Sequence, residues 1–484
     1  MSEVSEMMGK AAQLQRQNKT AEAMTAYSDI LMRWPKAADA WYNLALLQRQ
    51  ALRLGEALNS YQRALSHGIS RPEEVHLNRS VIFSDFLRDQ TSAAAELQQA
   101  LTLNPGYLPA LVNLANLYED SGKRPEASSL YARVLAIDPN AFEALARFAN
   151  VQAADGVDAA LIERLRQALE LAAAMSDRAS LGFALGRLLD AKGRYREAFA
   201  AYTSANQASW GSTGGQVIPY DRARHSAFVD RLISGGTPAV RAGSSSVAPR
   251  PIFIVGMFRS GSTLTEQLLA GIPGVAAGGE IGFLPQIVNT ELEPLFESLA
   301  GMTPARLDGI ATRYRAEFMR VSTGAEFITD KRLDNFLYIG LIKRLFPDAK
   351  IVHTTRDPLD NCLSIFFLHL DQQMSYALNL NDTGHYYREY RRLMAHWKRE
   401  FAGDIFDFNY DALVKEPQQQ SKALCEFLDL PWSGEVPKVV NRAGPVKTAS
   451  VWQVREPLYR TSSGRSRHYL DEIEGLRQEL ADLL

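Results

Sequence analysis

A glycine-rich turn near the middle of the chain has the residue types and spacing of an anion-binding loop. The apolar, β-branched run 252–255 is typical of a buried strand, and Gly256 and Gly261 bracket the turn that follows. Ser262 then opens a helical stretch, so backbone N–H groups and the positive helix end would face a bound phosphate or sulfate. The spacing matches a P-loop, but Ser262 stands where a nucleotide triphosphatase needs Lys. The turn therefore predicts a ligand with fewer phosphates.

A second anion signal follows the apolar run 350–354. Arg356 stands at the end of this predicted strand, where a guanidinium can bind a phosphate through two hydrogen bonds. Ser364 lies about two helical turns into the helix that Pro358 helps to start, so its hydroxyl could reach the same group. Arg–Asp pairs at strand ends are usually structural, and the signal depends on its combination with the glycine turn. Two such sites suit a nucleotide with phosphates at its 5′ and 3′ positions.

Strands and helices alternate in this half of the chain, which predicts a parallel sheet with helices on both faces. Ligands of such sheets bind beyond the carboxyl ends of the strands, where the glycine turn lies. The predicted strands are 252–255, 327–329, 350–354 and 405–408, and the predicted helices are 263–270, 337–346, 359–370, 386–400 and 418–428.

The N-terminal half is repetitive. Tyr27, Tyr61, Leu97 and Tyr131 share one register, 34, 36 and 34 residues apart, and an alanine precedes each by four residues. This is the period of the tetratricopeptide repeat, in which each unit is a helix pair. The fold class is therefore α plus α/β, an α-solenoid followed by a P-loop-like domain. We expect about six repeats over 5–207, a linker over 208–250 that is either flexible or folded onto the next domain, and a C-terminal domain over 251–484.

Three asparagines recur in the first helix of successive repeats. Asn43, Asn78 and Asn113 lie 35 residues apart, and an amide both donates and accepts hydrogen bonds. They resemble the asparagine ladder of the O-linked N-acetylglucosamine transferases, which implies a clamp on the backbone of a peptide or protein partner. The alternatives are polar residues on a solvated surface, and repeats that form a homodimer.

Composition excludes several classes of function. The net charge of −2 over 484 residues gives no sign of a nucleic-acid surface. Cys362 and Cys425 are the only cysteines, so a reducing compartment fits and no disulfide framework is indicated. Neither a signal peptide nor a membrane-spanning apolar run is recognisable, and the expected location is the cytoplasm.

Taken together, the two anion motifs resemble those of sulfotransferases. The stretch P-I-F-I-V-G-M-F-R-S-G-S-T-L resembles their 5′-phosphosulfate loop, and V-H-T-T-R-D-P-L-D-N-C-L-S resembles their 3′-phosphate motif. The resemblance covers about residues 250–470. It is greatest to bacterial tetratricopeptide-repeat sulfotransferases and next to tyrosylprotein sulfotransferases. It implies 3′-phosphoadenosine 5′-phosphosulfate as donor, adenosine 3′,5′-bisphosphate as product, and no metal.

The resemblance also implies roles for single residues. Arg259 would face the sulfuryl group, Lys331 would neutralise the bridging oxygen of the leaving phosphate, and Glu280 would be the general base. A carboxylate in an apolar glycine-rich turn could have a raised pKa. The alternatives are a surface Glu280 that caps the next helix and a solvated Lys331 at a strand end. His353, the rival base, lies inside a predicted strand and is interpreted as a packing residue.

The remaining expectations concern the donor and the acceptor. Leu368 replaces an arginine of the tyrosylprotein enzymes, so another cation is expected to serve the 3′-phosphate, and Arg465 stands where a lysine is usual. A peptide or protein tyrosine is the favoured acceptor, with a sugar, a lipid or a small phenol as alternatives. Two alternatives to a sulfotransferase are a P-loop-type kinase fused to repeats and a scaffold protein without catalytic activity. The expected donor-binding residues are Arg259, Ser260, Gly261, Ser262, Thr263, Arg356, Ser364, Tyr410, Ser450 and Arg465.

Overall fold

The structure is a computed structural model that describes residues 3–153, 156, 158–235, 248–292, 301–436 and 463–484. The chain divides into two compact units, Met1–Gln152 and Ala153–Leu484. This division falls earlier than the junction expected at 208–250, because the helices after residue 158 pack with the sheet-containing part of the chain.

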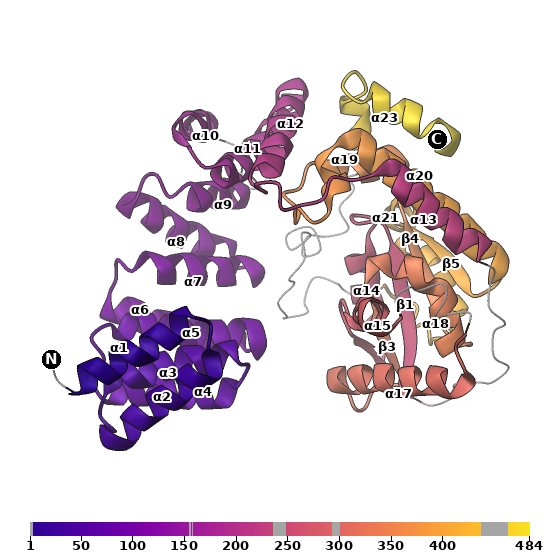
Figure 1. The fold of residues 1–484 in the computed structure, drawn as a ribbon. Coiled ribbons are helices and arrows are strands. Elements are labelled where there is room, and N and C mark those ends of the chain that lie inside the picture. The colour runs from indigo at the N-terminus through magenta and orange to yellow at the C-terminus, as the bar shows by residue number, and fades with distance from the viewer. Residues whose placement is uncertain (1–2, 154–155, 157, 236–247, 293–300, 437–462) are drawn as a thin grey trace. The chain divides into compact units, whose positions relative to one another are not determined.

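The first unit consists of successive helix pairs (Figure 1). A short π-helical turn, Ile82–Phe86, extends α5. The helices are α1 (Glu3–Arg16), α2 (Thr20–Arg33), α3 (Ala38–Gln50), α4 (Leu54–Ser66), α5 (Pro72–Val81), α6 (Gln90–Leu103), α7 (Leu108–Asp120), α8 (Arg124–Ile137) and α9 (Phe142–Gln152).

The repeat register predicts the core of this unit. Tyr27, Tyr61, Leu97 and Tyr131 lie on α2, α4, α6 and α8 and are at most 2% exposed, and the alanine four residues before each is fully buried. The small alanine side chains let neighbouring helices approach, and the larger side chain one turn later fills the space between them. The predicted α-solenoid fold is confirmed.

The second unit contains a five-stranded parallel sheet with the strand order β2-β3-β1-β4-β5 (Figure 1). All four predicted strands are present, and the three-residue strand β2 was not predicted. Crossover connections that contain helices allow the strands to run parallel and place helices on the sheet faces. The strands are β1 (Arg250–Gly256), β2 (Val275–Ala277), β3 (Phe327–Asp330), β4 (Lys350–Thr355) and β5 (Ile405–Asn409).

Helices connect and cover these strands. The predicted helix 359–370 ends earlier, at Phe366, and the predicted helix 386–400 begins earlier, at Leu380. The described helices are α10 (Ala159–Leu171), α11 (Met175–Ala191), α12 (Tyr195–Gly211), α13 (Arg222–Ser234), α14 (Ser262–Leu269), α15 (Phe283–Glu291), α17 (Pro304–Val321), α18 (Ile339–Leu345), α19 (Pro358–Phe366), α20 (Leu380–Glu400), α21 (Tyr410–Lys415), α22 (Pro417–Phe427) and α23 (Glu474–Glu479).

The described part of the expected linker contains α13, which packs on α20. Arg222 Nε donates to Asp382 at 2.7 Å, and the Tyr220 hydroxyl lies 2.9 Å from His385 Nδ1. Of the two alternatives for this segment, these contacts support a folded segment rather than a flexible one.

Helices α11 and α12 pack unusually close together because glycines line their contact. A Cβ on Gly182 would lie 2.8 Å from the Ala205 Cβ, and a Cβ on Gly186 would lie 2.8 Å from the Tyr202 ring. Tyr202 is itself fixed, since its ring stacks on Phe367 with centroids 4.1 Å apart.

We predict that Gly186→Leu destabilises the second unit. Overpacking against the immobile Tyr202 ring costs about 3 kcal/mol, and the better helix propensity of Leu offsets about 1 kcal/mol, which leaves a net loss of about 2 kcal/mol. Urea unfolding of the full chain measures this loss, with Ser176→Leu at an exposed position of the same helix as control. Equal stability of the two variants would contradict the close approach of the helices.

Candidate active site

The carboxyl ends of β3, β1 and β4 lie side by side at one edge of the sheet. β1 pairs with β3 on one side, with Phe253 opposite Asp330, and with β4 on the other, with Gly256 opposite Thr354. The strands that follow β1 in the sequence lie on both sides of it, β3 and β2 on one side and β4 and β5 on the other. Open parallel sheets bind ligands at such a switch in strand order. Lys331, the glycine turn and Arg356 therefore follow three adjacent strand ends, and the prediction that the two anion motifs end neighbouring strands is confirmed.

Two glycines of the turn are required by close contacts. Gly256 has φ +148°, and a Cβ there would lie 2.5 Å from the carbonyl oxygen of Thr354. Gly261 has φ +98° and lies against the Tyr410 ring, 2.8 Å from where its Cβ would be. The Arg356 Cζ lies 5.3 Å from the centroid of the same ring. Three expected donor-binding residues, Gly261, Tyr410 and Arg356, thus come together.

Serine hydroxyls differ in what they can offer a ligand. The Ser260 hydroxyl is buried and donates to the Met257 carbonyl oxygen at 2.6 Å, with the Thr354 hydroxyl at the same distance. It therefore stabilises the turn. Ser262 begins α14 and is 5% exposed, whereas Thr263 beside it is half-buried. Whether these residues bind the donor stays a prediction.

Arg259 joins the glycine turn to α19. It adopts a left-handed backbone conformation with φ +68°, and its Nε donates to the Ser364 hydroxyl at 3.1 Å. Burial, with the positive charge of Arg356 next in importance, lowers the pKa of Arg259 to about 10. In this structure the side chain thus contacts a residue assigned to the 3′-phosphate, and its contact with the sulfuryl group stays a prediction.

Lys331 and Glu280 form an ion pair at the end of β3. Lys331 is 3% exposed, and its Nζ lies 2.8 Å from Glu280 Oε1. This burial argues against the solvated alternative for Lys331. The Glu280 side chain is 48% exposed, so it is not enclosed by apolar groups. It also does not cap α15, whose N-cap is Gly282 without a side-chain hydrogen bond.

Glu266 holds the turn that carries Glu280, a role that sequence reasoning missed. Its buried carboxylate accepts from Gly279 N at 2.9 Å and from the Thr329 hydroxyl at 2.7 Å. Burial raises the pKa of Glu266. A glutamate one turn into the helix after the glycine loop was the available signal, but nothing in the sequence shows that it meets residue 279.

The other side of the edge is formed by Arg356 and the start of α19. Arg356 is 6% exposed, and its Nη2 lies 4.0 Å from Asp360 Oδ2. The Asp360 carboxylate also accepts from Gly464 N at 2.5 Å and Ser466 N at 2.7 Å, which ties the C-terminal segment to this helix. Ser450 lies outside the described residues, and its role stays a prediction.

Arg465 has a carboxylate partner on helix α11. Its Nη2 lies 2.5 Å from Asp190 Oδ2, and its Cζ lies 5.1 Å from the centroid of the Phe367 ring. Closure of this arginine over the donor phosphates stays a prediction. His353 is 1% exposed and contacts Asp407 at 2.7 Å and the Tyr390 hydroxyl, so its interpretation as a packing residue agrees with the structure.

The three asparagines of the repeats share one local geometry. Each side-chain Nδ2 donates to the backbone oxygen four residues earlier, at 2.8 Å for Asn43 and Asn113 and at 3.0 Å for Asn78. Asn78 is also engaged by the neighbouring repeat, because its Nδ2 donates to the Tyr42 hydroxyl and its Oδ1 accepts from Arg49 at 3.0 Å. A peptide would have to displace these bonds, and the clamp stays a prediction.

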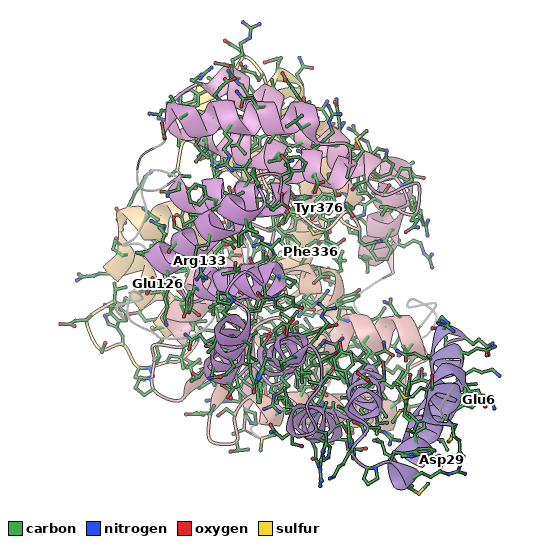
Figure 2. The ribbon with its side chains drawn as sticks, turned by 90° about the vertical axis from the view of Figure 1, so that its left-hand side faces the viewer. Glu6, Asp29, Glu126, Arg133, Phe336 and Tyr376 are labelled. Atoms are coloured by element: carbon green, nitrogen blue, oxygen red, sulfur yellow. The ribbon has the colours of Figure 1, made fainter. Side chains whose placement is uncertain are left out.

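A groove of about 600 Å³ lies between α6, α7 and α8. Glu126 and Arg133, both from α8 and labelled in Figure 2, are among its lining residues, whereas Asn113 is not. The groove is therefore a different surface from the asparagine row.

Two features are absent from the described residues. No helix in the described ranges has both the length and the hydropathy needed to cross a bilayer. Those ranges also contain no group of three or more His, Cys, Asp or Glu side chains placed to hold a metal ion.

Comparison with known proteins agrees with this architecture. Residues 251–434 match the sulfotransferase family, and residues 89–154 match the tetratricopeptide repeat. These two matches agree with the sulfotransferase-like domain that the anion motifs predicted and with the helical repeats that the repeat register predicted.

Individual proteins resemble parts of this chain. An uncharacterized protein of Aquifex aeolicus is 32% identical over 78% of this chain and 51% of its own length. Protein-tyrosine sulfotransferase 1 of Danio rerio is 24% identical over 41% of this chain and 59% of its own length. The chain spans about half the length of these relatives. A solved tetratricopeptide repeat protein from Parabacteroides merdae has a TM-score of 0.35 at 18% identity, over 47% of this chain and 91% of that chain.

Asp330 gives the site a pH-dependent stability. Its fully buried carboxylate accepts from the Tyr314 hydroxyl and from Arg332 N at 3.0 Å, and burial raises its pKa to about 7. Because the folded-state pKa exceeds the unfolded value, the stabilising contribution is complete below about pH 4 and is lost as pH rises through about 7.

We therefore predict that the stability difference between wild type and Asp330→Asn changes with pH. From pH 4.5 to 7.5 the wild type should lose stability relative to the variant, by about 1.4 kcal/mol for each pH unit up to the folded-state pKa of about 7. Urea unfolding at both pH values measures the difference, and Asp471→Asn at an exposed position is the control. A difference that is constant with pH would contradict the assignment.

Proposed function

We propose that the chain is a sulfotransferase that moves a sulfuryl group from 3′-phosphoadenosine 5′-phosphosulfate to a hydroxyl acceptor. The observation that carries the proposal is the convergence of Lys331, the glycine turn and Arg356 on one sheet edge within the region that matches the sulfotransferase family. Gly256 and Gly261, where a side chain would collide with Thr354 or Tyr410, keep the backbone open to a phosphate group.

The roles of the residues follow from where charge develops. During transfer the bond between sulfur and the bridging oxygen breaks, a bond between sulfur and the acceptor oxygen forms, and the acceptor loses its proton. Lys331, buried at the end of β3, is placed to neutralise the leaving phosphate oxygen. Glu280, 2.8 Å from Lys331 and half exposed, is placed to take the proton of an acceptor that arrives from solvent.

Arg259, Arg356 and Ser364 form the opposite side of the proposed donor site. Arg259 contacts Ser364 at 3.1 Å, and the Arg356 guanidinium lies by the Tyr410 ring, 5.3 Å from its centroid. The Arg356 guanidinium and the Ser364 hydroxyl match the oxygens of the 3′-phosphate, Arg259 beside them serves the sulfuryl group, and the aromatic ring suits the nucleotide.

For the acceptor we propose a tyrosine of a peptide or protein. The name of the Danio rerio relative supports this choice, and the repeats offer a surface on which a polypeptide could dock. Incubating the protein with radiolabelled donor and a lysate of its host, followed by identification of the labelled species, tests it. Label found only in sugars, lipids or small phenols would contradict the choice of acceptor and leave the donor assignment intact.

The proposed donor site should bind the product nucleotide. We expect isothermal titration calorimetry to detect binding of adenosine 3′,5′-bisphosphate and Arg356→Ala to weaken it at least about tenfold, because a charged hydrogen-bond donor is lost. Arg313→Ala, which removes an exposed arginine of α17, is the control. Absence of binding to the wild-type chain would overturn the proposed function.

The proposed general base can be tested by its removal. Glu280→Ala should lower transfer to the identified acceptor by at least about 100-fold, since proton abstraction is lost. Affinity for the bisphosphate should change by less than about threefold. Glu426→Ala, which breaks an exposed pair with Lys422 on α22, is the matched control. Full activity of the Glu280 variant would remove this residue from the mechanism.

A further inference from the structure

One face of helix α11 is directed toward the C-terminal end of α19, although α11 precedes the region that matches the sulfotransferase family. The Phe183 ring stacks on His369 with centroids 5.0 Å apart, and the Asp190 carboxylate binds Arg465 and the Tyr469 hydroxyl. Arg187 stands between these two anchors, four residues after Phe183 and three before Asp190. This spacing places all three on one helix face.

Helix α12 contacts the C-terminal end of α19, and these contacts determine which part of α19 lies near α11. Asn206 Nδ2 donates to the Phe366 carbonyl oxygen at 2.9 Å, and Tyr202 stacks on Phe367. Ser364 lies on α19 two residues before Phe366, and its hydroxyl accepts a hydrogen bond from Arg259. The part of α11 that carries Arg187 therefore lies beside the end of α19 at which Ser364 and Arg259 meet.

The electrostatics agree with this placement. Arg187 is half-buried, and its positive charge adds to those of Arg356 and Arg465 in lowering the pKa of Arg259, after the larger effect of burial. Asp190 balances Arg465, and Asp360 lies 4.0 Å from Arg356. Arg259 and the three guanidinium groups that act on it form a site suited to a multiply charged anion.

We propose that Arg187 binds the 3′-phosphate of the donor and product, so that the helix pair α11–α12 completes the nucleotide site. The inference rests on the proposed function and adds a binding residue from outside the matched region. Leu368, four residues after Ser364, is apolar and cannot neutralise a phosphate. In this proposal Arg187 supplies the positive charge that Leu368 lacks.

The test compares two nucleotides that differ only in the 3′-phosphate. Calorimetry on the full chain would measure adenosine 3′,5′-bisphosphate and adenosine 5′-monophosphate with the wild type, Arg187→Gln and Arg187→Lys. Arg178→Gln, at an exposed position of the same helix, is the matched control. We expect Arg187→Gln to weaken bisphosphate binding about tenfold or more, with a change of less than about twofold for the monophosphate.

The outcomes separate this inference from the function on which it rests. Arg187→Lys keeps the charge and should bind the bisphosphate more tightly than Arg187→Gln, which guards against a fold defect in the latter. An equal loss for both nucleotides would show a structural role and overturn the inference. Unchanged bisphosphate binding by Arg187→Gln would also overturn the inference, but it would leave the proposed function intact. A wild-type chain that binds neither nucleotide would overturn both.

Discussion

The parallel pairing of β3, β1 and β4 is the constraint on which the site depends. Thr354 of β4 lies opposite Gly256 of β1. The Thr354 hydroxyl lies 2.6 Å from the Ser260 hydroxyl and donates to the Val255 carbonyl oxygen at 3.2 Å. A slip of one residue would turn the Thr354 side chain to the other face of the sheet and remove both contacts. The glycine turn would then lose its support, and the charged residues that follow each strand would no longer share one edge.

Two cationic side chains at that edge of the sheet are buried, although burial disfavours the charged form. Lys331 and Arg356 are 3% and 6% exposed, and a buried charge is tolerated only with partners. Lys331 has Glu280 at 2.8 Å, whereas the carboxylate near Arg356 lies 4.0 Å away. Hydrophobic residues of similar size often give a stability at least as high as a buried ion pair. Buried cations around a glycine turn therefore contribute little to folding, and they suit the anionic ligand that we propose.

Local sequence pattern was sufficient for much of this architecture. Periodic alanines and tyrosines predicted the solenoid, and short runs rich in apolar residues predicted four of the five strands, because these signals lie within a few neighbouring residues. Strand β2 has only three residues and little periodicity. The early start of α20 depends on the Asn379 cap, whose side chain accepts from the N–H groups of residues 381 and 382.

The side chains that sequence reasoning missed act across long sequence separations. Glu266 supports residue 279 from another element, Asp330 is buried against Tyr314, and Arg187 reaches the site from a helix before the matched region. Their types are ordinary for their positions, and only the folded arrangement gives them a role. The same holds for Glu280, whose pairing with Lys331 was not part of the prediction.

The helix pair α11–α12 shows how a repeat-like helix pair can be covered within the second unit. Ala198 and Tyr202 have the same four-residue spacing as the alanine–tyrosine pairs of earlier repeats, and both are buried. In the repeats of the first unit, such a tyrosine packs among repeat helices. Tyr202 instead stacks on Phe367 after α19, and the fully buried Tyr469 of the C-terminal segment binds Asp190 beside it. A terminal repeat needs a cover for its apolar face. Because the cover here includes the end of α19, the helix that carries Ser364, the packing that closes the helix pair also fixes one wall of the candidate site.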